Sequence, residues 1–124
     1  MIAQDKEKYK DELKRAISYL ENLGYGPIKA DLDGYETPKS YHNKERNITV
    51  TPDIIAEKEG RIHIFDLSLK SENLRLLKSK WLFLNTLSQL KSYRFRLITT
   101  KGHYKFTHKT KDAIHLDTVH LLKI

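Results

Sequence analysis

The chain has 124 residues, of which 39% are apolar and 31% charged, with a net charge of +7 and a mean hydropathy of −0.62. This length suits one domain, residues 1–124, and the balance is too apolar for a disordered chain. No run approaches the roughly 20 apolar residues that cross a bilayer, the first residues are too charged for a signal peptide, and cysteine is absent. We therefore expect a cytoplasmic, intracellular protein without a membrane partner, in which any metal has carboxylate or imidazole ligands.

The positive charge is concentrated in one part of the chain. Between Asn73 and Lys111 there are ten basic residues and no acidic one, whereas the rest has 13 basic and 16 acidic residues. Clustered Lys and Arg favour a polyanionic partner, because they release counterions on binding phosphates, although a solvated surface kept for solubility is the alternative. Aromatic residues interleave with the basic ones at 101–111, as base stacking requires. The expected nucleic-acid contacts are Lys78, Arg94, Arg96, Lys101, Tyr104, Lys105, Lys109 and Lys111.

The amino-terminal third predicts one helix and little regular structure after it. Apolar residues at helical spacing predict a helix from about Asp5 to Leu23, and Gly24 ends it. The next stretch is rich in turn residues and leaves room for one short strand, either Ile28–Leu32 or Glu36–His42.

Two β-rich runs flank a glycine-containing turn and predict a hairpin with the arms Ile48–Glu57 and Arg61–Lys70. If the turn has two residues, Asp53 lies opposite Asp66, with Cβ atoms roughly 4.5–5.5 Å apart. Two carboxylates that close repel unless they hold a cation such as Mg²⁺. A three-residue turn would instead place Phe65 opposite Asp53, and the sequence leaves both turns open.

The second half of the chain predicts a helix and two strands. The helix covers Asn73–Lys91, with Ser71 or Asn73 as its cap. Beyond it we expect a strand at Arg94–Thr100, a loop or extended arm at Lys101–Lys111 and a last strand at Ile114–Ile124. The order α-β-β-β-α-β-β predicts an α/β fold with helices packed on a central mixed β-sheet.

The residues around the two aspartates resemble the PD-(D/E)xK nuclease superfamily, whose restriction-endonuclease-like fold includes Holliday-junction resolvases, RecB-type exonuclease domains and phage endonucleases. The matching motifs are Pro52-Asp53, Ile64-Phe65-Asp66-Leu67-Ser68 and Gln89-Leu-Lys-Ser-Tyr93, which is similar to the QxxxY element of the RecB-like branch. The resemblance implies a bacterial or phage-type metal-dependent DNA endonuclease that hydrolyses phosphodiester bonds with Mg²⁺ or Mn²⁺. Its substrate would be branched or duplex DNA, and cutting both strands predicts a homodimer.

Carried over onto this chain, the resemblance implies that Asp53 and Asp66 bind the metal together with a carboxylate of the first helix. We take Glu12 as that carboxylate, with Asp5 as the second choice. Gln89 would position the phosphate or the attacking water.

The family's lysine, two residues after the second acidic residue, is replaced here by Ser68. Lys70 lies on the same predicted strand face as Asp66, so we expect it to take this catalytic role ahead of Lys78 on the next helix, and Ser68→Lys to rescue part of its loss. The departure keeps two alternatives open. One is a catalytically inactive nucleic-acid-binding module on the same fold, and the other is a basic RNA-binding domain in which the aspartates are incidental.

Overall fold

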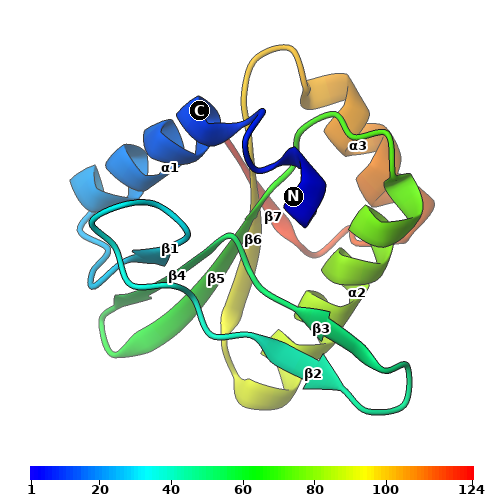
Figure 1. Ribbon diagram of the computed structural model, residues 1–124, viewed down its shortest axis with the longest axis horizontal. Helices are drawn as coiled ribbons and strands as arrows, with labels where there is room; N and C mark the ends of the chain where they lie inside the picture. The colour runs from blue at the N-terminus through cyan, green and yellow to red at the C-terminus, as the bar shows by residue number, and fades with distance from the viewer.

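The computed structural model describes residues 1–124 and has an α/β architecture, with a mixed five-stranded sheet between helices (Figure 1). Neighbouring strands follow the order β1-β4-β5-β6-β7. The pairs β1-β4 and β4-β5 are antiparallel, whereas β5-β6 and β6-β7 are parallel. The strands are β1 (Lys29–Ala30), β4 (Ile54–Lys58), β5 (Arg61–Leu67), β6 (Arg94–Thr99) and β7 (His120–Lys123), and β2 (Tyr41–Asn43) with β3 (Ile48–Val50) forms a separate hairpin.

Helices cover both faces of the sheet. A 3-10 turn η1 (Ala3–Asp5) precedes α1 (Lys10–Asn22), and the other helices are α2 (Leu74–Lys91) and α3 (Tyr104–Ala113). In Figure 1, α1 lies on one side of the sheet, and α2 and α3 lie on the other. We call these two sides the α1 face and the α2 face.

Because side chains along each strand point alternately to the two faces of the sheet, each face has its own hydrophobic core. On the α1 face, Leu13 and Ile17 pack with Phe65 and Leu67 in one buried cluster. On the α2 face, the second cluster contains Ile64, Leu97, Leu77, Trp81 and Leu84. None of the helices is long and apolar enough to cross a membrane.

The hairpin turn has two residues, which confirms the register that sets the aspartates opposite one another. Lys58 pairs with Arg61, and Ile54 pairs with Phe65. Both turn residues have positive φ, 53° at Glu59 and 75° at Gly60, as a type I′ turn requires. The backbone geometry is strained for the glutamate but ordinary for glycine.

Several predicted boundaries differ from the observed ones. The first helix begins at Lys10 rather than near Asp5. The run 48–57 is divided into β3 and β4, which fits the absence of an N–H donor at Pro52. The second arm ends at Leu67 rather than at Lys70. The helix at Asn73–Lys91 is confirmed, and the Asn73 side chain caps it by accepting from the Leu76 N–H at 3.2 Å.

The predicted loop or arm at Lys101–Lys111 is wrong, because this stretch contains α3. The buried residues of α3 are Thr107 and Thr110 rather than apolar side chains, so the helical period is faint in the sequence. The last strand is also shorter than predicted and covers only His120–Lys123.

Candidate functional site

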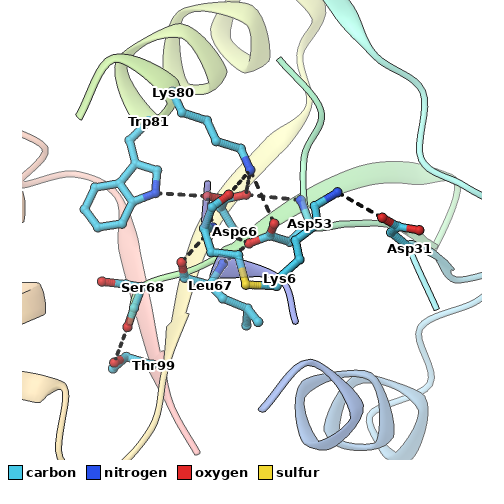
Figure 2. A network of polar contacts seen from close by, with 10 residues as sticks. Lys6, Asp31, Asp53, Asp66, Leu67, Ser68, Lys80, Trp81 and Thr99 are labelled. Atoms are coloured by element: carbon cyan, nitrogen blue, oxygen red, sulfur yellow. Dashed lines mark hydrogen bonds and ion pairs between the residues drawn. The ribbon is translucent and has the colours of Figure 1, made fainter. Parts of the chain in front are cut away.

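Asp53 and Asp66 lie side by side in the α2 face. Asp53 directly precedes β4, Asp66 belongs to β5, and their exposed fractions are 3% and 0%. Figure 2 shows the two carboxylates pointing toward one another, with Lys80 and Trp81 of α2 approaching them from the helix. The predicted pairing of these two residues is therefore confirmed.

Two ammonium groups neutralise the pair. The amino-terminal nitrogen of Met1 lies 2.5 Å from Asp53 Oδ2 and 2.8 Å from Asp66 Oδ2. Lys80 Nζ lies 3.0 Å from Asp66 Oδ1 and 3.3 Å from Asp53 Oδ1, and it also donates to the Met1 carbonyl. Two negative and two positive charges therefore balance inside the protein.

Neutral donors complete the shell around the carboxylates. The Leu67 N–H donates to Asp53 Oδ2 at 2.7 Å, and the Asp53 N–H donates to Asp66 Oδ1 at 3.1 Å. Trp81 Nε1 donates to Asp66 Oδ2 at 3.0 Å. Three of the four carboxylate oxygens therefore accept two hydrogen bonds or ion-pair contacts each, and Asp53 Oδ1 accepts one, from Lys80, so no carboxylate oxygen is left without a partner.

The pKa values of the three side chains reflect this arrangement. Burial by itself raises the pKa of Asp53, but the charges of Lys80 and the Met1 ammonium outweigh burial and lower this pKa to about 2. Burial and the neighbouring charge of Asp53 raise the pKa of Asp66. Burial opposes the charge of Lys80, but the two carboxylates outweigh burial and raise the pKa of its ammonium group. Lys80 is therefore a permanent cation at neutral pH.

The surroundings of the Met1 ammonium fit a hard divalent cation. Its three partners are Asp53 Oδ2, Asp66 Oδ2 and the Leu67 carbonyl oxygen, the last at 3.0 Å. Carboxylate and carbonyl oxygens are the ligands that Mg²⁺ prefers. No group of three His, Cys, Asp or Glu side chains gathers anywhere in the chain, so the fit rests on two carboxylates and a carbonyl.

A pocket of about 440 Å³ adjoins this cluster on the side of Met1 and Lys80. Its walls come from the amino-terminal segment, β3 and α2. Two further basic side chains, Lys6 and Arg46, line it. The pocket therefore offers an anionic group a positively charged approach to the buried aspartates.

Lys80 is the site residue that the sequence analysis missed. It lies three residues after Leu77 and four before Leu84, both of which are fully buried on the inner side of α2. A lysine inside an apolar helical period is the pattern that could have revealed it.

Glu12 does not join the two aspartates, so its prediction as a metal ligand is wrong. It belongs to α1, which packs on the α1 face, whereas the aspartates lie in the α2 face. Its charge acts instead on His103, whose pKa it raises against the larger lowering effects of burial and Lys70. Asp5, the second choice, lines a surface pocket with Lys70.

Lys70 does not reach Asp66 either. The strand alternation on which its prediction rested stops at Leu67, where β5 ends. The backbone of Lys70 is held by the Tyr9 hydroxyl and by His103 Nδ1, and its side chain is exposed. Lys78 also misses the site, because it is half-buried outside the inner side of α2.

Gln89 is exposed near the carboxyl end of α2. It follows Lys80 by nine residues, or roughly 13 Å along a helix. The expectation that Gln89 positions a phosphate or water beside Asp53 and Asp66 is therefore wrong.

Ser68 is enclosed rather than catalytic. Its hydroxyl lies 2.6 Å from Thr107 Oγ1, and its carbonyl accepts from Thr99 Oγ1 at 2.7 Å. Figure 2 shows the Ser68–Thr99 contact beside the aspartate cluster. Ser68, which stands where the resembling nucleases have a lysine, therefore joins the end of β5 to β6 and α3.

The predicted nucleic-acid contacts do not form one surface. Arg94 and Arg96 project from β6 on the α1 face, opposite the side on which α2 and α3 pack. Lys101, Lys105 and Lys109 are exposed in or before α3, whereas Tyr104 and Lys111 are half-buried there. The ring of Tyr104 contacts the ammonium group of Lys123 at 5.2 Å.

No protein-family model, no curated protein and no solved structure matches this chain.

Proposed function

We propose that this protein is a metal-dependent DNA endonuclease with a restriction-endonuclease-like fold, whose site is formed by Asp53, Asp66 and Lys80. The observation that carries the proposal is the convergence of Asp53 Oδ2, Asp66 Oδ2 and the Leu67 carbonyl oxygen on one cation. A Mg²⁺ or Mn²⁺ ion held by these oxygens would activate water and stabilise negative charge on the phosphate. To bind there, the ion must displace the Met1 ammonium.

Lys80 supplies the cation that Ser68 lacks. Its ammonium group contacts both aspartates and lines the adjoining pocket. Because its pKa is raised, Lys80 keeps its proton and cannot act as a general base. It stabilises negative charge on a phosphate that enters the pocket, together with Lys6 and Arg46 at the pocket wall.

A specific observation also favours the second candidate, an inactive nucleic-acid-binding module. The four charges of the cluster balance, and each member is at least nine-tenths buried. A cluster of this kind is complete without a metal ion, since each buried charge already has partners of the opposite charge. The two candidates differ in one respect: only the endonuclease requires the oxygens to exchange an ammonium for a metal ion.

Cleavage of plasmid and four-way-junction DNA with Mg²⁺ or Mn²⁺ tests the proposal. We expect the wild type to cut, Asp66→Asn to be inactive and Lys80→Met to lose on the order of 10²-fold or more in kcat. Lys70→Ala is the matched lysine control and should cut at the wild-type rate. Circular dichroism establishes that each variant is folded.

Isothermal titration with Mn²⁺ separates the candidates further. The endonuclease should bind Mn²⁺ through Asp53 and Asp66, and Asp66→Asn should abolish this binding. If the wild type neither binds Mn²⁺ nor cuts either substrate faster than Asp66→Asn, the endonuclease is contradicted, and DNA binding that persists in EDTA would then support the inactive module.

A further inference from the structure

A row of basic side chains crosses the α1 face beside the carboxyl end of α1, where Lys58 Nζ donates to the Leu23 carbonyl at 2.7 Å. Register places Lys58 beside Arg61, and His63 beside Arg94. Arg96 follows Arg94 by two residues on the same face of β6. Neighbouring members of this row are therefore roughly 5–7 Å apart at their Cα atoms. We call these five residues, Lys58, Arg61, His63, Arg94 and Arg96, the basic strip.

No carboxylate neutralises the basic strip. The ion pairs of the chain involve Met1, Lys6, Lys29 and Lys80 as cations, and none involves a strip residue. The exposed side of α3 carries a carboxylate as well as lysines, because Asp112 is exposed three residues after Lys109, although no ion pair joins the two. Four like charges on adjacent strands repel one another unless an anion binds between them.

The strip is held rigid by hydrogen bonds that leave donors free. Arg61 Nε donates to the Ser92 carbonyl at 3.2 Å, and Arg96 Nη1 donates to the Tyr25 hydroxyl at 2.9 Å. Each guanidinium has five N–H donors, so the remaining ones can bind a phosphate. The Arg94 side chain is exposed and forms no hydrogen bond or ion pair within the chain.

His63 adds an independent observation at the centre of the strip. Its side chain is nearly buried, with the residue 7% exposed, yet its Nδ1 atom has no hydrogen-bond partner. Buried polar atoms are rarely left unpaired without a reason. Burial lowers the pKa of His63, and so do the charges of Arg96, Arg61, Arg94 and Lys58. The effect of these four cations shows that the electrostatic potential at His63 is positive. An anion on the strip would relieve this potential.

We infer that the basic strip is a binding surface for the phosphate backbone of a nucleic acid, separate from the aspartate site. His63 and Asp66 are three residues apart on β5 and point to opposite faces of the sheet. The strip therefore contacts a different segment of the nucleic acid from the one at Asp53 and Asp66. The inference rests on the proposed DNA substrate but not on its hydrolysis.

Fluorescence anisotropy with a labelled duplex and a labelled single strand, in the presence of EDTA, tests the inference. We expect Arg61→Ala/Arg94→Ala to weaken binding roughly tenfold or more and to reduce the salt slope by about two units. Lys105→Ala/Lys109→Ala removes the same charge from α3 and is the matched control, with a smaller loss expected. Arg94→Glu, at an exposed side chain, is a second variant that should weaken binding further than Arg94→Ala.

Three outcomes would overturn the inference. They are wild-type affinity in the strip variants, an equal loss in the α3 variant, and complete displacement of DNA by low-millimolar inorganic phosphate, which would indicate a small-anion site. Because EDTA removes divalent metals, binding does not depend on catalysis. Strip-dependent binding without cleavage would contradict the endonuclease alone, and cleavage with unchanged binding by the strip variants would contradict the strip alone.

Discussion

Lys80 is the residue on which the charge balance of the aspartate cluster depends. Its ammonium group contacts both carboxylates, so its removal leaves two negative charges with one positive charge. Breaking a buried ion pair by deleting one partner usually destabilises a protein by about 3–5 kcal/mol. Lys80 is therefore expected to contribute to the stability of the fold as well as to the proposed chemistry.

We predict that Lys80→Met lowers the free energy of unfolding by about 3–5 kcal/mol in urea titrations. Lys78→Met, two residues away and half-buried, is the control and should change it by less than about 0.5 kcal/mol. The double variant Asp53→Asn/Lys80→Met should recover part of the loss, because it removes the uncompensated carboxylate. Equal stability of Lys80→Met and the wild type would contradict the buried ion pairs.

His63 makes stability depend on pH. Its pKa in the folded protein is lowered from 6.5 by burial and by four neighbouring cations, so the unfolded chain takes up the proton first as the pH falls. The stability that depends on an uncharged His63 is therefore fully present above the unfolded pKa of 6.5, and it is lost as the pH falls through the lower pKa of the folded protein. The rings of Tyr25 and Phe65 pack against His63 and contribute to its burial.

We predict that the wild type loses stability between pH 7 and pH 5 and that His63→Phe loses less over the same interval. Thermal unfolding at several pH values measures the difference in slope. The slope that remains includes His103, whose pKa burial also lowers. A slope unchanged by His63→Phe would show that His63 is not protonated on unfolding in this interval.

At the scale of elements, a network of hydroxyl groups fastens α3 to the end of β5. Thr107 Oγ1 contacts both Ser68 Oγ and Thr99 Oγ1, at 2.6 and 3.1 Å. Ser68, Thr99 and Thr107 are each 0% exposed. A long charged side chain at position 68 has no free space and no carboxylate partner within this network.

Ser68→Lys, which restores the motif of the resembling nucleases, should therefore destabilise the chain by about 2 kcal/mol or more rather than rescue catalysis. Ser68→Ala should cost only about 1 kcal/mol, because Thr107 keeps its contact with Thr99. Chemical denaturation of both variants measures the two losses. A Ser68→Lys protein as stable as the wild type would mean that the enclosure opens easily.

At the scale of the whole molecule, the outer side of α2 carries exposed apolar residues. Leu76, Leu82 and Leu90 are 52%, 41% and 81% exposed, and Leu82 and Leu90 line a groove toward the β2-β3 hairpin. Apolar patches of this kind often mark protein interfaces. We predict that this surface forms a homodimer, which the proposed cleavage of both strands of a duplex would require.

We predict that light scattering gives a mass near twice the 14.6 kDa of one chain. Leu82→Glu/Leu90→Glu should produce monomers, because burying two carboxylates against apolar residues is costly. Leu23→Glu, at an exposed leucine beyond α1, is the control and should leave the mass unchanged. A monomeric wild type at high micromolar concentration would contradict dimerisation.

The sequence by itself determined the parts of this protein that local rules govern. A hairpin turn at Gly60 follows from turn chemistry, but the sequence left its length open, and the two-residue turn that places Asp53 opposite Asp66 was decided by the structure. The inner side of α2 follows from helical periodicity, and capping preference narrowed the cap to Ser71 or Asn73, of which the structure uses Asn73. These features depend on residues close together in the chain.

Only the tertiary structure decided which charges meet the aspartates. Met1 and Lys80 lie 52 and 27 residues from Asp53 in the chain, and no periodicity relates such distant residues. Tertiary packing also places Glu12 on the α1 face, away from the aspartates, and ends β5 before Lys70. The same packing stabilises α3, although its sequence lacks an apolar helical period. The physical reason is that a buried charge needs a partner of opposite charge, and packing of the whole fold, rather than proximity in sequence, determines which residues can be that partner.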